Sequence, residues 1–243
     1  MKHNKSLRVL CFCTTIALLF SANGFAADAA DRPANGTRMI ALTFDDGPNH
    51  ANTAKILDVL EVNGAKATFF VIGSLLAQNA DVARRAQSMG CEIGNHTYDH
   101  KTWTGLSKDA VLEQIGKADA VIENVLGRRC ALVRAPGGHC CGCGKLAERP
   151  LVLWSVDTED WKYGALKNGN TAKNRERVIR AATENVQDGD IILMHDIYAF
   201  TAECCEVIVP RLREQGFTLV TVSEMMNRRC IEMHSGGVYC SAR

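Results

Sequence analysis

Short apolar runs alternate with amphipathic stretches along most of this 243-residue chain. Several runs are rich in β-branched or aromatic residues and are too short for helices, so they predict buried strands. Strand–helix alternation predicts a parallel sheet, either open or closed into a barrel. The predicted strands are MIALTF (39–44), ATFFVIG (67–73), CEIG (91–94), ALVRAP (131–136), LVLWSVD (151–157), IILMHD (191–196) and FTLVTV (217–222). The predicted helices cover residues 51–62, 108–126, 174–187 and 202–215.

The first 27 residues have the order of a secretory signal peptide, with a basic start, an apolar run and small residues. The apolar run, residues 9–20, is shorter than the roughly 20 residues that a membrane-spanning helix needs. We therefore expect residues 1–27 to be removed and residues 28–243 to form one domain. The mature protein is expected outside the cell, in the periplasm or in the cell envelope, without a stable membrane anchor.

The composition limits the class of protein further. Apolar residues make up 47% of the chain and charged residues 23%, which is ordinary for a globular protein and excludes a disordered one. The formal net charge is +1, and the arginine pairs are scattered along the chain. Binding to nucleic acid needs clustered Lys and Arg, so we expect no nucleic-acid partner. We expect a monomer.

Nine cysteines follow the predicted signal peptide. In an oxidising compartment several should pair, and the odd number leaves at least one without a partner in the chain. Cys91 and Cys130 each begin a predicted strand, so we expect a disulfide between them, with Cys230 and Cys240 as a second pair. The short segment 139–150 needs a covalent tie, for which the candidates are Cys140, Cys141 and Cys143 with Cys204 and Cys205.

Five of the seven predicted strands end in polar residues that can perform chemistry. The active site of an α/β barrel lies at the carboxyl ends of its strands, so this regularity predicts one composite site. The residues are Asp45 and Asp46, His96 and His100, Arg134, Asp157 and Asp160, and His195 and Asp196.

Three of these residues form a candidate metal-ligand set. Asp46, His96 and His100 give two imidazoles and one carboxylate, which suits Zn²⁺ with an open position for water. The same set suits the iron of non-haem oxygenases, although the strand–helix alternation speaks against their fold. Solvated turn carboxylates and ordinary core or surface histidines are the alternatives. Thr97 stands where zinc proteases of the H-E-x-x-H type carry their glutamate, so a base must come from elsewhere.

Further strand-end residues suggest proton transfer. Asp45 can handle a proton while its neighbour binds a metal, and Arg134 can pair with Asp45. Asp157 can orient His195 and keep its imidazole basic.

The ordered motifs TFDDG, NHTYDH, RAPGG, DTEDW and LMHD resemble the five signature motifs of the polysaccharide deacetylases. These form carbohydrate esterase family four and share the nodulation-protein-B homology domain. The resemblance covers residues 38–222. It implies a distorted (β/α) barrel of about seven parallel strands that removes acetyl groups from N-acetylglucosamine units in peptidoglycan or chitin-like glycans. Some members act on O-acetylated xylan instead, which is the alternative activity.

The resemblance also implies roles for individual residues. The metal, usually zinc with Co²⁺ also compatible, falls to Asp46, His96 and His100. Asp45 matches the catalytic base, His195 the acid, Arg134 the tether of the base and Asp157 the residue that tunes the acid. Leu193 and Trp161 match walls of the acetyl pocket. Gly137 keeps an N–H for an oxyanion, but it replaces an aromatic residue that relatives carry.

Two readings of a different class remain. A catalytically inactive sugar-binding module would lack a ligand or the base, and all of these residues are present. A cysteine-rich metal-binding protein would use Cys140, Cys141 and Cys143, for which disulfide pairing is the commoner fate after export.

Overall fold

Strands and helices alternate through residues 37–138 and 147–243, which are the residues that the computed structural model describes. The expected signal peptide and the cysteines Cys140, Cys141 and Cys143 lie outside these residues. The strands are β1 (Met39–Asp45), β2 (Thr68–Val71), β3 (Glu92–Asn95), β4 (Leu151–Val152), β5 (Val156–Asp157), β6 (Ile191–His195), β7 (Thr218–Leu219) and β8 (Val238–Tyr239). The helices are α1 (His50–Val62), α2 (Gly73–Leu76), α3 (Ala80–Ser88), α4 (Lys108–Leu126), α6 (Asp160–Gly164), α7 (Ala172–Thr183), α8 (Ala199–Glu214) and α9 (Val222–Arg228).

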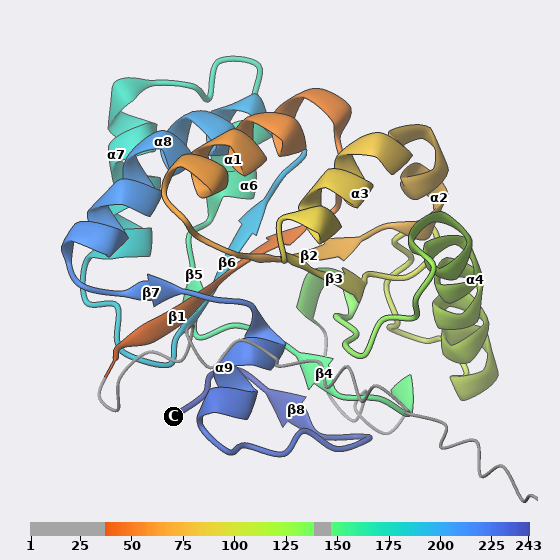
Figure 1. Cartoon of the computed structure of the whole chain (residues 1–243). Coiled ribbons are helices and arrows are strands. Elements are labelled where there is room, and N and C mark those ends of the chain that lie inside the picture. The colour runs from red at the N-terminus through yellow and green to blue at the C-terminus, as the bar shows by residue number, and fades with distance from the viewer. Residues whose placement is uncertain (1–36, 139–146) are drawn as a thin grey trace, which may run out of the picture. The chain divides into compact units, whose positions relative to one another are not determined.

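The main sheet is parallel, with the strand order β3-β2-β1-β6-β5 and with β7 paired to the start of β1 (Figure 1). Beyond β3, bridges from Asn95 to Val133 and from Val133 to Leu151 lead to the β4–β8 pair. The strands therefore form a distorted (β/α) barrel, as the family resemblance implies. In the register of β1 and β6, Asp45 lies opposite His195, so two candidate catalytic groups meet at one edge.

Helix α4 has the predicted bounds, and its sequence explains why. The side chain of Ser107 accepts a hydrogen bond from the N–H of Ala110 at 3.2 Å, which caps the first turn. Gly127 ends the helix with a φ of 70°, a left-handed conformation that glycine adopts without steric cost. The residues that α4 buries recur at helical spacing along one face: Val111, Gln114, Ile115, Ala118, Ile122 and Leu126.

Three predicted strands differ from the structure. The run 217–222 is shortened to β7, because α9 begins at Val222 with Thr221 as its cap. The run 131–136 is reduced to bridge pairing at Val133, because Arg134 turns its side chain into the protein and a Pro-Gly-Gly turn follows. The run 151–157 is divided into β4 and β5, which pair with different neighbours, β8 and β6. β8 was not predicted, since its two residues carry no strand pattern of their own and depend on β4 for pairing.

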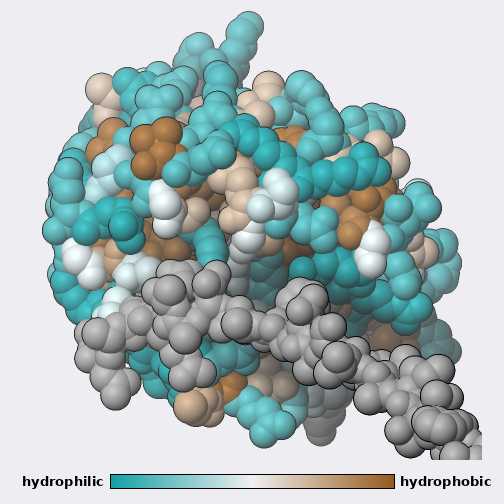
Figure 2. All heavy atoms as spheres, in the orientation of Figure 1, coloured by the Kyte–Doolittle hydropathy of each residue, from teal (hydrophilic) through white to brown (hydrophobic). Residues whose placement is uncertain are grey.

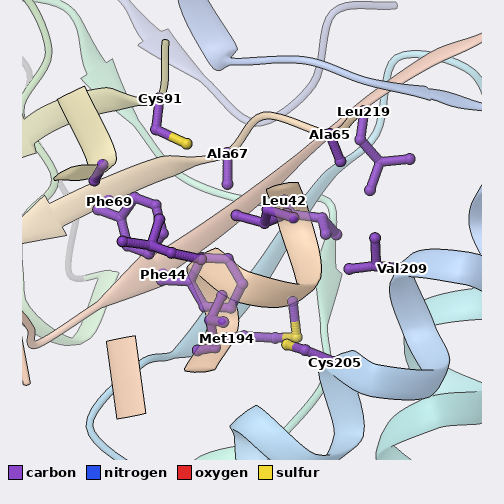
Figure 3. Close-up of a cluster of buried hydrophobic side chains, with 14 of the residues drawn as sticks. Leu42, Phe44, Ala65, Ala67, Phe69, Cys91, Met194, Cys205, Val209 and Leu219 are labelled. Atoms are coloured by element: carbon purple, nitrogen blue, oxygen red, sulfur yellow. The ribbon is translucent and has the colours of Figure 1, made fainter. Parts of the chain in front are cut away.

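The largest apolar cluster packs helices against β1, β2 and β6 (Figure 3). Phe44 of β1 and Phe69 of β2 stack with ring centroids 5.1 Å apart, and Met194 of β6 and Cys205 of α8 extend the contact. In Figure 1, α1 and α8 lie side by side over this part of the sheet. Every one of these four side chains is buried, so the cluster fixes the strands whose ends carry the site.

The expected disulfide between Cys91 and Cys130 is not formed in the structure. Both thiols are buried, and burial raises the pKa of Cys91 and raises that of Cys130 to about 12. Cys204 and Cys205 are buried free thiols as well. Cys230 is an exposed free thiol, so the expected disulfide from Cys230 to Cys240 is not formed. The four buried cysteines, Cys91, Cys130, Cys204 and Cys205, act as small apolar residues of the core, a role for which free cysteine is well suited.

The visible surface in Figure 2 is mainly hydrophilic, with apolar residues in small separate areas. Within residues 37–138 and 147–243, no helix is long and apolar enough to cross a membrane.

The free thiols give a test of the packing. In denaturant without reductant, we expect Cys91 and Cys130 to react fully with iodoacetamide, and we expect slow reaction of both in the folded protein because they are buried. Peptide mapping by mass spectrometry measures the modification at each site. Recovery of an unmodified Cys91–Cys130 peptide pair from the denatured sample would contradict the structure.

Candidate active site

A buried ion pair stands at the carboxyl end of β1. Arg134 is fully buried, and its Nη1 donates to Asp45 Oδ1 at 2.7 Å and to Thr43 Oγ1 at 2.8 Å. Its Nε and Nη2 donate to the backbone carbonyls of residues 152 and 153 at 3.0 and 2.9 Å. The guanidinium also lies over the ring of Phe70, 4.1 Å from the centroid. One oxygen of Asp45 is therefore held in place, while Oδ2 lies 3.7 Å from His96 Nε2.

The predicted ligand residues Asp46, His96 and His100 converge. Oδ1 of Asp46 lies 3.4 Å from His96 Nε2 and 3.1 Å from His100 Nε2, and one ligand atom from each residue falls within 4.8 Å of the others. Asp46 Oδ1 is buried and makes no hydrogen bond. Burial would raise the pKa of Asp46, but the two imidazoles lower it well below its ordinary range. An ionised, unpartnered oxygen between two imidazoles fits a divalent cation such as Zn²⁺.

His96 is held in the tautomer that a metal needs. Its Nδ1 lies 2.8 Å from the backbone carbonyl oxygen of Arg134. A carbonyl oxygen only accepts hydrogen bonds, so Nδ1 carries a proton, and Nε2, which faces Asp46, is the nitrogen that the neutral ring offers to a metal. Histidines that bind metals commonly donate their other N–H in this way.

His195, at the end of β6, is oriented by Asp160 and not by the predicted Asp157. Nδ1 of His195 lies 2.8 Å from Asp160 Oδ1, and the backbone N–H of His195 donates to Asp160 Oδ2 at 2.8 Å. Thr201 donates to the same Oδ2 at 2.6 Å, and Asp160 is fully buried. Asp157 is exposed and instead accepts a hydrogen bond from the N–H of Glu159 at 2.8 Å. We therefore assign the orienting contact to Asp160.

The environment of His195 favours the protonated imidazole. Burial alone would lower the pKa of His195, but the hydrogen bond to Asp160 and the nearby carboxylates Asp45 and Asp46 raise it to about 9. The physical cause is the negative charge around a ring that has little contact with solvent.

These groups share one cleft of about 390 Å³. The predicted Gly137, Trp161 and Leu193 line it, with Leu193 buried and Trp161 exposed. Asp157 also lines it, so this carboxylate reaches the cleft without touching His195. The remaining lining residues are Asp45, Asp46, His96, His100, Trp154, His195 and Tyr198.

Sequence reasoning missed two residues of the site, Trp154 and Tyr198. It placed Asp160 among the strand-end residues but gave the orienting role to Asp157, the other acidic candidate in the DTEDW motif. Trp154 and Tyr198 follow β4 and β6 closely, so the strand-end rule that found the other residues also covers them.

The fold and the site together define a (β/α) barrel with a candidate metal centre flanked by acid–base side chains. Residues 32–141 match the family described as polysaccharide deacetylase. A peptidoglycan-N-acetylglucosamine deacetylase of Bacillus cereus is 32% identical over 201 residues, which cover 79% of this chain and 90% of that protein. The chain belongs to the polysaccharide deacetylase family.

Two further relatives extend the comparison. The peptidoglycan-N-acetylmuramic acid deacetylase PdaC of Bacillus subtilis is 39% identical over 189 residues, which cover 77% of this chain and 38% of PdaC. The chain thus spans about two fifths of that relative's length. The structure of a family 4 acetyl xylan esterase from Clostridium thermocellum, in complex with a cobalt ion, matches with a TM-score of 0.76 and 29% identity. That match covers 84% of this chain and 98% of the esterase chain.

The reassignment of Asp157 can be tested by titration. In the metal-free protein, Asp160→Asn should lower the pKa of His195 from about 9, because a buried negative charge is lost, while Asp157→Asn should leave it nearly unchanged. NMR titration of the imidazole resonances measures both. An equal fall in the two variants would contradict the assignment.

The same contact predicts a pH dependence of stability. The pKa of His195 in the folded protein lies above its ordinary value of 6.5, so the protonated ring stabilises the fold fully below pH 6.5. This contribution is lost as the pH rises through about 9. The free energy of unfolding of the wild type, minus that of Asp160→Asn, should therefore decline over this interval in urea titrations.

Proposed function

We propose that this chain is an exported, metal-dependent polysaccharide deacetylase that hydrolyses the acetamide of N-acetylglucosamine units in peptidoglycan or chitin-like glycans. One observation carries the proposal: the convergence of Asp46, His96 and His100 in the same cleft as Asp45 and His195. Family membership and the names of the relatives support hydrolysis of acetylated glycans. The same membership argues against a non-haem iron oxygenase, which would need the same three ligands on another fold.

Asp46, His96 and His100 would hold the metal, and zinc suits their nitrogen and oxygen donors. A bound divalent metal lowers the pKa of water towards 7 and polarises a carbonyl oxygen, which is the chemistry that a stable amide needs for hydrolysis. The remaining steps fall to the side chains of this chain.

Asp45 is proposed as the general base. Its Oδ1 is occupied by Arg134, so Oδ2, on the side of His96, is the oxygen free to accept a proton from the attacking water. Arg134 cannot give up its own proton at neutral pH and is anchored by further hydrogen bonds, so it fixes the position of the base. A base held in place in this way contributes about 10²–10⁴-fold in rate.

His195 is proposed as the general acid. Addition of the water oxygen to the acetyl carbon is followed by cleavage of the C–N bond, and the amine needs a proton to leave. Nδ1 of His195 is bound to Asp160, which leaves Nε2 to donate that proton. The raised pKa of His195 supplies the protonated form at neutral pH. The products are acetate and a free glucosamine amine.

The walls of the cleft are proposed to bind the substrate. The buried Leu193 offers an apolar contact for the acetyl methyl group, and the exposed Trp161 offers a flat ring for a sugar face. The N–H of Gly137 is the proposed donor to the developing oxyanion, a contact that is worth about 10²–10³ in rate.

The alternative substrate is an acetyl ester, as in O-acetylated xylan. The observation in its favour is the structural match to an acetyl xylan esterase. Acetate release from peptidoglycan, chitin oligomers and acetyl xylan should be compared with equal amounts of enzyme. Preferred release from xylan would replace the amide proposal with the ester one. Sequencing the amino terminus of the exported protein tests whether residues 1–27 are removed and whether residues 28–243 form the mature domain.

The assigned roles predict different behaviour for two variants. Asp45→Asn should keep the metal and lose about 10²–10⁴-fold in acetate release, because a base is lost and no ligand is. His96→Ala should lose both metal and activity. Elemental analysis and an acetate assay measure the two quantities. The control is His50→Ala, an exposed histidine on α1 paired with Asp81, which should change neither. An Asp45→Asn enzyme of near-normal rate would sink the base assignment.

A further inference from the structure

The segment from His96 to His100 carries both candidate histidine ligands in an unusual backbone conformation. Thr97 has a φ of 70° and His100 a φ of 60°, both in the left-handed region that non-glycine residues rarely adopt. Each such residue carries a conformational cost and persists only where its surroundings hold it. The contacts that hold this segment therefore decide where the ligands stand.

Helix α2 and Asn95 hold part of the segment. The N–H groups of Gly73 and Ser74 in α2 donate to the carbonyls of Thr97 and Tyr98 at 3.0 and 2.9 Å. The side chain of Asn95 accepts from the N–H of Thr97 at 2.8 Å. These bonds satisfy the carbonyls of Thr97 and Tyr98 and the N–H of Thr97. The N–H groups of Tyr98 and Asp99 need other acceptors.

Gln114 of α4 serves those two groups with a single atom. Its Oε1 accepts hydrogen bonds from the N–H of Tyr98 and from that of Asp99, both at 3.3 Å. Gln114 is only 8% exposed, although a glutamine is usually found at the surface. It is a polar residue on the buried face of an amphipathic helix, and its oxygen faces the backbone between the two histidines.

The two histidines depend on this contact to different degrees. His96 is fixed independently, since its ring is bonded to the Arg134 carbonyl and its N–H donates to Val71 at 3.0 Å. His100 has a side chain that is 41% exposed, and its ring contacts only the other two candidate ligands among the described residues, with Nε2 3.1 Å from Asp46 Oδ1 and its centroid 5.0 Å from that of His96. The position of His100 therefore rests on the backbone that precedes it.

We propose that Gln114 is a positioning residue for His100 and thereby sets the affinity of the site for its metal. This inference rests on the proposed function, because it takes Asp46, His96 and His100 as the ligands. Loss of the Gln114 oxygen leaves the N–H groups of Tyr98 and Asp99 without their acceptor. The backbone before His100 is then less fixed, so the His100 ring is held less well in the position for the metal. Removal of groups that orient a metal ligand typically weakens metal binding by about 10–100-fold.

The test uses variants that separate the oxygen from the bulk of the side chain. Gln114→Met keeps a similar volume without the acceptor. Gln114→Glu keeps the acceptor and is made together with Asp99→Asn, because Gln114 also bonds the Asp99 carboxylate, which a second carboxylate would repel. Zn²⁺ and Co²⁺ affinities are measured by competition with a chelator, and the melting temperature of each metal-free protein is recorded. We expect Gln114→Met to bind about 10–100-fold more weakly and Gln114→Glu with Asp99→Asn to bind nearly as the wild type does. Gln87→Leu, which removes a glutamine bonded to the Leu126 carbonyl at 3.2 Å, is the matched control.

A double-mutant cycle separates positioning from general loosening of the fold. In a His100→Ala background, Gln114→Met should weaken residual metal binding by less than about threefold, because the residue that it positions is gone. Equal weakening in both backgrounds, or unchanged affinity in Gln114→Met, would overturn the proposal. If the wild type binds neither metal, or if His96→Ala binds as tightly as the wild type, the proposed function itself fails.

One measurement does not depend on any variant. In the wild type, the N–H groups of Tyr98 and Asp99 should exchange with solvent deuterium slowly, at rates near those of the neighbouring turns of α4. Exchange as fast as that of an open loop would show that Gln114 does not hold them, and it would overturn the proposal even if the Gln114→Met protein failed to fold.

Discussion

The buried ion pair between Arg134 and Asp45 is the interaction on which the rest of this structure depends. A buried charge is tolerated when it is paired and hydrogen-bonded, and Arg134 is paired with Asp45 and uses four of its five N–H donors. Those bonds reach β1 and the backbone after β4, so they join segments on either side of Val133, where the sheet is reduced to single bridges. Gly94 leaves room beneath the pair, since a Cβ there would lie 2.5 Å from the Phe70 ring under the guanidinium.

The backbone pairing is thus sparse at Val133, next to a residue whose side chain makes four hydrogen bonds. The single residue that compensates for the missing strand also holds the candidate base and, through its carbonyl oxygen, the ring of His96. Loss of Arg134 would leave Asp45 as an uncompensated buried carboxylate, which costs several kcal/mol in proteins. Stability and site geometry are therefore coupled at this one position.

The sequence predicted those elements whose position depends on local interactions. Helix α4 follows from its cap, its spacing and its terminal glycine, and β1 and β6 follow from continuous apolar runs. The strand-end rule located Asp45, Asp46, His96, His100 and His195 because parallel strands bring their carboxyl ends together.

The sequence did not predict those contacts that depend on the tertiary arrangement of distant residues. Asp157 and Asp160 are three residues apart in DTEDW, and no local rule states which of them reaches His195. The choice depends on the turn at Glu159, whose φ of 57° was not foreseeable, and on Thr201 from a distant helix. The free state of Cys91 and Cys130 was also not predictable from the sequence, because disulfide formation depends on the directions of the two side chains in the folded protein. Gln114 did leave a signal, since it interrupts the apolar face of a predicted helix.

The parallel register of β1 and β6 has a consequence for how this fold can diversify. Asp45 and His195 are direct cross-strand partners, so their backbones are separated by the spacing of neighbouring strands, about 4.8 Å. That spacing is a property of the polypeptide ladder and not of any side chain. Walls of the cleft come instead from the segments that follow the strands, at Gly137, Trp154, Tyr198 and Trp161 of α6. Exchange of these surfaces can change the shape of the cleft while the distance between the backbones of Asp45 and His195 stays constant.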